Sequence, residues 1–372
     1  MLFKEVVGQK EIKEHLVEIG KSGDIPHASL FIAQKGAGAL PLALAFTQYL
    51  VCVNKQENDS CGTCAPCVKA QKLIHPDIHY TYPIIAKRPS PHQSLSTDYI
   101  AEWRKEITLN PYIDELDWLE AIGAENKQGN ITADEARAVI KTLNLTTFEA
   151  TYKIQIIWMA EALSKEGNIL LKLLEEPPPN TVLILIAENQ EEILPTILSR
   201  CQIIKINKID DTDIEKALLQ RGVPASNTQH IAYLADGNFH AALKLKDSET
   251  DTNTRLLTQW LDFSINMKTG DLIKWIDENG KIGRENIKSF FEYSIHIFRE
   301  ALMMLHIKNY DARLDNDEKQ LALRINKFLN YQKLDNLLQQ INKKHYEIER
   351  NVNPKMVLMD MSLHIYSIVR GK

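Results

Sequence analysis

Residues 28–53 read ASLFIAQKGAGALPLALAFTQYLVCV, an apolar run, a glycine-containing turn and a second apolar segment. The run Ala28–Ala33 has the length and composition of a buried strand. The turn Lys35-Gly36-Ala37-Gly38 follows it, and Pro41 suits the first turn of a helix, where its missing N–H would have no partner anyway. Strand, glycine turn and helix in this order are the layout of a phosphate-binding loop. The stretch therefore predicts an α/β domain built around this loop.

Three further apolar runs predict strands of the same sheet. They are Ile154–Met159, Thr181–Ala187 and Gln202–Ile206. The first two are continuous rather than alternating, as in strands that are buried on both faces. Helical segments separate the runs, including a stripe of apolar residues over 131–145. We therefore expect a mostly parallel, doubly wound α/β sheet.

The strand signal ends near Asn207, and the remaining sequence has the pattern of helices. Residues 211–247 fit three short helices, and 248–372 fit long amphipathic helices. The segment 84–130 differs from the strands and helices around it. It starts like an exposed loop and continues as a polar helical piece with Trp103 and Trp118. We interpret this segment as an insertion in the α/β core.

Length and charge exclude several classes of protein. A chain of 372 residues suggests two or three domains at roughly 100–200 residues each. The formal net charge of −5 argues against a protein that coats nucleic acid by charge alone. No apolar run approaches the ~20 residues that a membrane span needs. The first nine residues lack the pattern of a secretory signal. We therefore expect a cytoplasmic protein with no membrane partner.

Four of the five cysteines follow one another at the spacing C-x8-C-x2-C-x2-C: Cys52, Cys61, Cys64 and Cys67. Four thiolates at ~2.3 Å around one ion match a closed structural Zn²⁺ site, which has no open position for water and hence no hydrolytic role. Free thiols or two disulfides are one alternative, which a cytoplasmic location disfavours. Iron–sulfur ligation is another, because the spacing does not distinguish it. His75 lies near enough in sequence to replace one sulfur or to pack locally, whereas Cys201 is too distant to be a fifth ligand.

The glycine turn lacks the groups of an ATP-hydrolysing loop. Such a loop reads G-x-x-x-x-G-K-[ST], where Lys reaches the β- and γ-phosphates and Ser/Thr binds Mg²⁺. Here Ala33 stands at the first glycine and Gly38 at the second, while Ala39 and Leu40 replace the Lys and the Ser/Thr. We expect Gly36 and Gly38 to serve the turn rather than a nucleotide.

The end of the run 154–159 also lacks residues that ATP hydrolysis needs. Carboxylates that hold Mg²⁺ are expected there, but Trp158 and Met159 occupy these positions, and Glu161 lies beyond them. Two independent losses make ATP hydrolysis improbable, and we expect ATP not to be bound.

Several motifs together resemble those of one family. Residues 168–178 read NILLKLLEEPP and closely resemble the LLKxLEEPP signature of bacterial clamp-loader AAA+ subunits. The cysteine module is similar to that of the γ/τ and δ′ subunits of this family. Shorter stretches match further motifs of the family: Val7-Gly8-Gln9, His27-Ala28, Ser199-Arg200-Cys201 and Asn353-Pro354.

The resemblance covers nearly the whole chain and implies three domains. They are an AAA+ core over 1–207, a helical lid over 208–247 and an all-α collar or oligomerisation domain over 248–372. The core would contain the zinc module 52–67 and the insertion 84–130, for which the family offers no counterpart.

The chain resembles the δ′ subunits of the family, because it lacks the nucleotide-binding residues and keeps the Ser-Arg-Cys motif. In this family γ/τ subunits keep the phosphate loop and the acidic pair, whereas δ′ subunits keep the fold and the Ser-Arg-Cys motif. The resemblance implies that Arg200, with Ser199 and Cys201, is an arginine finger that reaches the γ-phosphate of ATP in a neighbouring γ/τ subunit. A finger supplied in trans is worth roughly 10³–10⁵ in rate in other systems. Without the family motif, Arg200 would be interpreted as pairing with a carboxylate.

The resemblance also implies a function and partners. The chain would be a non-catalytic subunit of the DNA polymerase III clamp loader, completing a ring with γ/τ and δ subunits. It would reach the sliding clamp and primed DNA through the assembled hetero-oligomer. The alternatives are a γ/τ-type ATPase or nucleotide switch with weak ATP binding, and a zinc protein that binds nucleic acid directly.

Some residues depart from the family pattern. His240 stands near the position of a sensor arginine in active relatives, and Glu188-Asn189 stand where a threonine is usual. In the insertion, Lys87-Arg88 and Trp103 form either a partner surface or a solvated loop, and we favour the loop.

Overall fold

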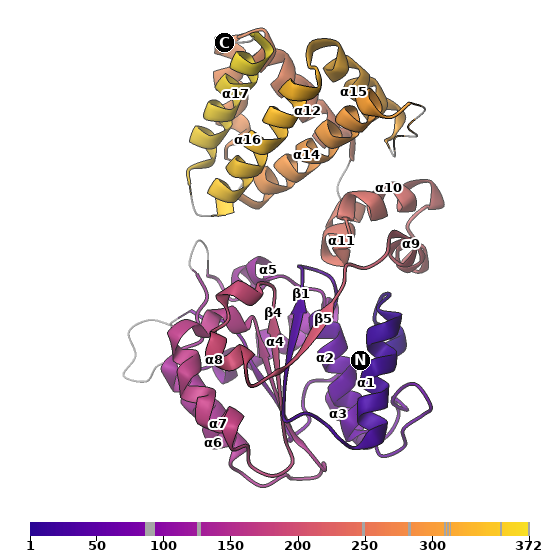
Figure 1. The fold of residues 1–372 in the computed structure, drawn as a ribbon, viewed down its shortest axis with the longest axis vertical. Helices are drawn as coiled ribbons and strands as arrows, with labels where there is room; N and C mark the ends of the chain where they lie inside the picture. Colours follow the sequence, from indigo (N-terminus) through magenta and orange to yellow (C-terminus); the bar gives the residue numbers. More distant parts are fainter. Residues whose placement is uncertain are drawn as a thin grey trace. The chain divides into compact units, whose positions relative to one another are not determined.

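A computed structural model gives the fold of the chain (Figure 1). It describes residues 1–85, 94–124, 128–247, 250–281, 284–308, 310, 312, 314–349 and 352–370. The chain forms two compact units. The first comprises Met1–Thr228 with Ala235–Leu243, and the second comprises Gln229–Leu234 with Lys244–Lys372.

The first unit contains a five-stranded parallel sheet in the order β2-β3-β4-β1-β5. The strands are β1 (Ala28–Ala33), β2 (Ile78–Thr81), β3 (Lys153–Trp158), β4 (Thr181–Ala187) and β5 (Gln202–Ile206). Ala28 pairs with Leu183 across β1 and β4, and Ser29 pairs with Gln202 across β1 and β5. The predicted parallel α/β sheet is confirmed, and all carboxyl ends of its strands lie at one edge. Strand β2 was not predicted from the sequence; it is short and lies at the border of the sheet.

Two layers of helices cover the sheet (Figure 1). Alternate strand residues face the two layers: Phe31, for example, belongs to the apolar cluster with α1 and α2, whereas Leu30 belongs to the cluster with α6 and α7. The helices of this unit before β5 are η1 (Phe3–Glu5), α1 (Lys10–Ser22), α2 (Ala39–Val51), α3 (Ala65–Gln71), η2 (Ser96–Tyr99), α4 (Ile100–Leu109), α5 (Glu115–Ala121), α6 (Ala133–Leu143), η3 (Ala160–Leu170), α7 (Leu171–Glu175), η4 (Gln190–Glu192) and α8 (Pro195–Leu198).

The segment 84–130 is partly buried in this unit, which corrects the interpretation of Trp103 as a surface or loop residue. Trp103 in α4 and Trp118 in α5 are fully buried, and their rings meet edge to face at 5.2 Å between centroids. The indole N–H of Trp118 donates to the carbonyl oxygen of Pro83 at 2.7 Å. The segment is polar in overall composition, so the burial of its two tryptophans was not predicted. Lys87-Arg88 lie outside the described residues.

Helices make up the rest of the described chain. Three short helices follow β5 as predicted: α9 (Asp211–Gln220), α10 (Ala225–Ala235) and α11 (Phe239–Asp247). The second unit has its own apolar core and contains α12 (Thr250–Ile265), α13 (Thr269–Asn279), α14 (Arg284–His306), α15 (Asn316–Phe328), α16 (Tyr331–Glu349) and α17 (Pro354–Arg370). No helix in the described residues is long and apolar enough to span a membrane. The boundary between lid and collar at residue 247 stays a prediction.

Candidate functional site

The glycine turn after β1 is closed by side chains of the same chain. Tyr112, just before α5, lies against Gly38, where an added Cβ would be 3.3 Å from the Tyr112 ring atom Cε1. Asn238 covers Gly36, where an added Cβ would lie only 1.8 Å from the Asn238 Oδ1 atom. The backbone N–H of Phe239 donates to the Gly36 carbonyl oxygen at 3.1 Å. Both glycines have positive φ angles, 66° and 97°. They are therefore required by the turn and by these close contacts.

The N-terminal segment forms hydrogen bonds with the turn and with Tyr112. The backbone N–H of Val7 donates to the Tyr112 hydroxyl at 2.7 Å, in a buried position. The Gln9 side chain donates to the carbonyl oxygens of Ala37 at 3.0 Å and Asn207 at 2.6 Å. The resemblance-based motif Val7-Gly8-Gln9 thus ties the turn to the end of the sheet.

Little open space is left at the turn. A cavity of about 30 Å³ remains there, lined among others by Leu40, Pro41, Tyr112 and Met159. Small-molecule sites usually enclose roughly 300–1,000 Å³, about ten times this volume or more. In this conformation, the side chains around the turn leave only a small cavity.

The positions expected to hold Mg²⁺ carry apolar side chains in an apolar environment. Trp158 ends β3 and is 4% exposed. Its ring lies 5.4 Å from the Trp103 ring, which stacks on Tyr82 at 4.1 Å. Met159 follows with a left-handed backbone and is also buried. Neither side chain offers an oxygen ligand to a divalent cation.

Carboxylates gather around Lys35 at the same edge of the sheet. Burial raises the pKa of Glu188 to about 7, with Lys35 opposing this and nearby carboxylates, led by Glu161, adding to it. Burial also raises the pKa of Glu161, although this carboxylate accepts backbone N–H bonds from Glu188 and, at 2.8 Å, from Asn189. The positive charge of Lys35 thus interacts with carboxylates of the same chain.

His240 contacts α5 and the segment that precedes it. The Asn110 amide donates to its Nδ1 atom at 3.1 Å, and its Nε2 atom lies 2.9 Å from an Asp117 carboxylate oxygen. Asp114, Asp117 and His240 are close enough to share a metal ion. The Asn110 orientation is fixed, because its oxygen accepts from the backbone N–H of Tyr112 at 3.0 Å. A neutral ring therefore carries its proton on Nε2, which leaves no lone pair there for a metal.

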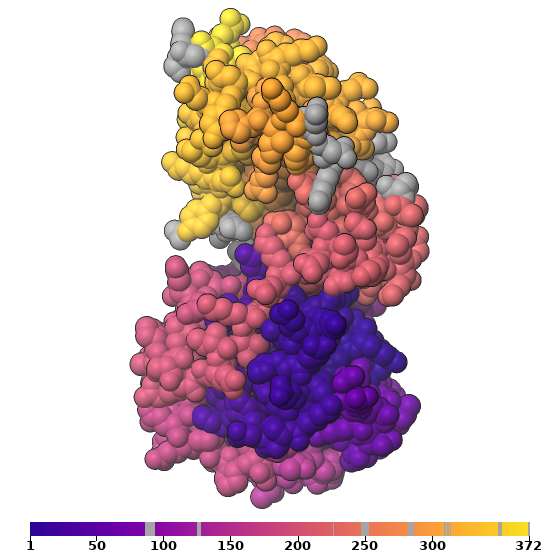
Figure 2. Space-filling view, turned by 45° about the vertical axis from the view of Figure 1, so that its right-hand side comes forward, coloured from indigo at the N-terminus to yellow at the C-terminus, as the bar shows by residue number. Residues whose placement is uncertain are grey.

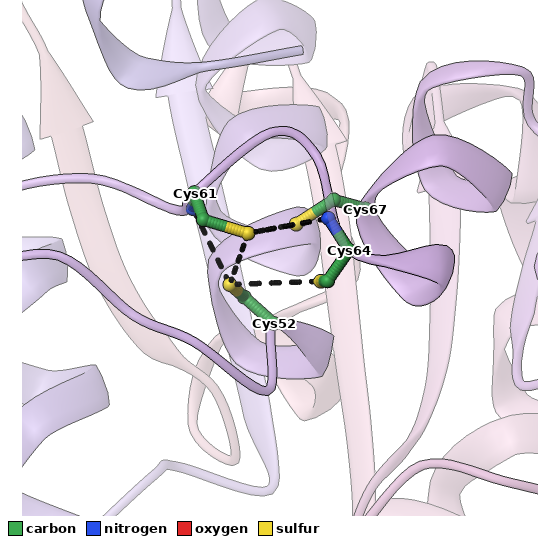
Figure 3. Close-up of side chains that lie close together, drawn as sticks. All are labelled: Cys52, Cys61, Cys64 and Cys67. Carbon is green, nitrogen blue, oxygen red and sulfur yellow. Dashed lines mark hydrogen bonds between the residues drawn. The ribbon is translucent and has the colours of Figure 1, made fainter.

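The four predicted cysteines lie together around one point (Figure 3). The Sγ–Sγ distances are 3.6 Å for Cys52–Cys61, 3.9 Å for Cys61–Cys67 and 4.0 Å for Cys52–Cys64. A tetrahedral ion with bonds of ~2.3 Å separates its sulfur ligands by about 3.8 Å, whereas a disulfide requires about 2.05 Å. The four cysteines can thus hold a metal ion, and they are not paired as disulfides.

Backbone donors and burial act in opposite directions on these thiols. N–H groups of Thr63 and Cys64 lower the pKa of Cys61 to about 6. Burial raises the pKa of Cys52 and of Cys67. Two buried thiols would carry charge only beside a cation, which fits a metal ion at the centre of the four cysteines.

The cysteine module also holds the start of the chain. Asp59, between Cys52 and Cys61, accepts the backbone N–H groups of Phe3 at 3.0 Å and Lys4 at 3.1 Å. Figure 2 shows the indigo N-terminal residues and this purple segment side by side on the surface. His75 is not part of the cluster; its Nδ1 accepts the N–H of Asp77 at 3.1 Å, and its Nε2 lies 3.3 Å from Glu149.

Arg200 lies at the surface directly after α8, and its side chain is 32% exposed. Its guanidinium donates to Glu175 at 2.5 and 2.9 Å, to the Thr196 carbonyl at 2.9 Å and to the Ser199 hydroxyl at 3.1 Å. Cys201 is half-buried, and burial raises the pKa of its thiol to about 11. A thiol that stays protonated is a poor nucleophile.

Comparison with known proteins decides the family. The sequence model of the family described as "DNA polymerase III, delta subunit" matches residues 8–210, more than half of the chain. The chain belongs to this family. Its relatives include subunits of the same polymerase with different names.

Three relatives illustrate the similarity. DNA polymerase III subunit tau of Bacillus subtilis is 24% identical over 385 residues, which cover 95% of this chain and 59% of the relative. DNA polymerase III subunit delta′ of Bacillus subtilis is 25% identical, covering 62% and 57%. The delta′ subunit of Escherichia coli is 26% identical, covering 79% and 75%. The chain thus spans less than two thirds of the two Bacillus relatives.

Sequence reasoning missed the residues that fill the turn of this DNA polymerase III family member. Tyr112 lies in an irregular segment after Pro111, and Asn238 lies in the loop between α10 and α11. Neither is adjacent to the turn in sequence, and neither belongs to a periodic pattern. The only available signal was the large aromatic side chain itself, which needs burial somewhere.

Proposed function

We propose that this chain is a clamp-loader subunit of the δ′ type, which binds no nucleotide and acts on its neighbour. It completes a hetero-oligomeric ring with γ/τ and δ subunits of the DNA polymerase III holoenzyme. In this ring Arg200 serves as the arginine finger for ATP bound to a γ/τ subunit. The ring then loads the sliding clamp onto primed DNA, which this subunit reaches through its partners.

The filled turn is the observation that carries the proposal. Tyr112 and Asn238 occupy the surroundings of the two glycines, and about 30 Å³ is left. Ala39 and Leu40 add neither a positive charge nor a Mg²⁺ ligand. A γ/τ-type ATPase would need open space at the glycines, a Lys for the phosphates and a Ser or Thr for Mg²⁺.

The exposure of Arg200 supports action on a neighbour. Phosphoryl transfer spreads negative charge over the transferred group, and a guanidinium from another subunit neutralises it without needing a nucleotide of its own. Arg200 follows the short helix α8 on the surface of the first unit, where another chain can reach it.

We further propose that the cysteine cluster binds one structural Zn²⁺. Four sulfurs at tetrahedral spacing leave no open position, so the ion would stabilise the module and the N-terminal segment held by Asp59. Direct nucleic-acid binding by the module is disfavoured by the net charge of −5.

Titration of labelled ATP onto the purified chain tests the proposal against its main alternative. We expect no binding at micromolar ATP and no turnover, because the loop lacks the Lys and the Ser/Thr and because Tyr112 and Asn238 pack against its glycines. A purified γ/τ-type subunit measured in parallel is the positive control. Micromolar binding with turnover by this chain would identify it as an ATPase instead.

A further inference from the structure

The signature segment that ends α7 contains two neighbouring glutamates with different surroundings. Glu175 and Glu176 are both exposed. Only the Glu175 carboxylate contacts Arg200, with one oxygen accepting from Nε at 2.9 Å and from Nη2 at 2.5 Å. In the described part of the chain, the Glu176 side chain has no hydrogen bond or ion pair. The pair of glutamates therefore provides a test residue and its matched control.

The contacts of Arg200 use most of its donors. A guanidinium has five N–H groups in a fixed planar fork. Nε and one Nη2 hydrogen bind Glu175, and Nη1 binds the Thr196 carbonyl at 2.9 Å and the Ser199 hydroxyl at 3.1 Å. These four bonds fix the plane of the guanidinium and leave one Nη2 hydrogen for an outside acceptor.

Both sides of this arrangement rest on buried anchors. Leu173 and Leu174 of α7 are buried, and the Leu174 carbonyl lies 2.9 Å from the His27 Nε2 atom before β1. On the other side, Ile197 of α8 is buried, and the N–H of Arg200 donates to its carbonyl at 3.0 Å. The carboxylate and the guanidinium are thus held by elements packed on the sheet, not by mobile surface side chains.

The exposure of the pair argues against a role in folding. The side chains of Arg200 and Glu175 are 32% and 51% exposed, and exposed ion pairs contribute little to stability. A carboxylate beside a catalytic guanidinium reduces the net positive charge of the site. Any benefit of Glu175 to catalysis must therefore come from orienting Arg200. Small displacements of a positioned group cost much of its catalytic effect.

We infer that Glu175 is the positioning residue of Arg200, orienting the guanidinium so that its free Nη2 hydrogen points to a phosphate oxygen in the neighbouring subunit. This inference rests on the proposed function of Arg200. It assigns a specific role to the first glutamate of the LLKLLEEPP segment and none to the second.

The test uses the assembled complex with ATP-hydrolysing partner subunits and primed DNA. We expect Glu175→Ala to lower kcat of the DNA-stimulated ATPase about tenfold with KM for ATP within about twofold of the unaltered complex. Glu175→Gln keeps an acceptor oxygen and should recover at least half of the lost rate. Glu176→Ala should behave like the unaltered complex. The melting temperature of each variant should stay unchanged, which separates positioning from folding.

The double variant separates the two proposals. In an Arg200→Ala background, Glu175→Ala should cause no further loss, because no guanidinium remains to be positioned. A normal rate with Glu175→Ala, or an additional loss in the double variant, would overturn the positioning role alone. A normal rate with Arg200→Ala would instead overturn the finger itself and with it this inference.

Discussion

The ring of Tyr112 lies against Gly38, so close that a Cβ on residue 38 would be 3.3 Å from the ring atom Cε1. In a nucleotide-binding loop this space belongs to phosphate groups, which backbone N–H groups of the loop surround. Here an aromatic ring packs beside the second glycine of the turn, and its hydroxyl accepts the backbone N–H of Val7. Residues of the turn and of the following helix, Ala37, Ala39 and Leu40, thus belong to the apolar core.

Tyr112→Phe should destabilise the first unit without opening it to nucleotide. The change removes the hydroxyl that accepts the buried N–H of Val7, and an unsatisfied buried donor costs about 1–3 kcal/mol. Urea denaturation followed by fluorescence measures the change in the free energy of unfolding. Tyr152→Phe is the control, because no hydrogen bond of its hydroxyl exists among the described residues, and it should change stability by less than about 0.5 kcal/mol. Equal effects of the two variants would show that the Val7 bond is unimportant.

Glu188→Gln should stabilise the protein in a pH-dependent way. The pKa of Glu188 in the folded chain is about 7, raised from 4.5 chiefly by burial. The folded state therefore binds this proton more tightly than the unfolded state, and stability falls as pH rises from about 4.5 through 7. The gain from Glu188→Gln should grow over this window, to at most about 3 kcal/mol at pH 8, since one pKa unit is worth about 1.4 kcal/mol.

Two results of this pH series bear on the cause. Lys35 lowers the pKa of Glu188, so Lys35→Gln should raise this pKa further, which extends the loss of stability to higher pH and makes it larger. Chemical denaturation at pH 5, 6.5 and 8 measures both variants. A benefit of Glu188→Gln that is the same at all three pH values would contradict the burial of a titrating carboxyl group.

Metal analysis of the purified chain should find about one zinc ion per molecule, and Cys64→Ser should abolish it. The melting temperature should fall by about 5–10 °C, because metal-binding free energy is also folding free energy. Cys201→Ser is the matched control, since Cys201 lies outside the cluster, and it should keep the ion. Unaltered zinc content in Cys64→Ser would refute the four-sulfur site.

Much of the fold was predictable because its signals are local. Runs such as Thr181–Ala187 are apolar along their whole length, and the cysteine spacing alone groups the four sulfurs. Ile78–Thr81 escaped prediction because it is short and includes the polar His79. Tyr112 escaped because its partner Val7 is distant in sequence. Contacts of this kind depend on the tertiary fold, and sequence periodicity does not predict them.

We propose that this chain acts on ATP bound to its neighbour and not on ATP of its own. The most direct test of this claim is the DNA-stimulated ATPase rate of the complex reconstituted with Arg200→Ala, Arg200→Lys or, as control, Arg137→Ala, an exposed arginine of α6. We predict that Arg200→Ala lowers the rate at the site it serves by about 10³-fold while the complex still assembles. Lysine should not restore the rate, because it lacks the planar fork, and Arg137→Ala should be neutral. An undiminished rate with Arg200→Ala in the assembled complex would contradict the claim.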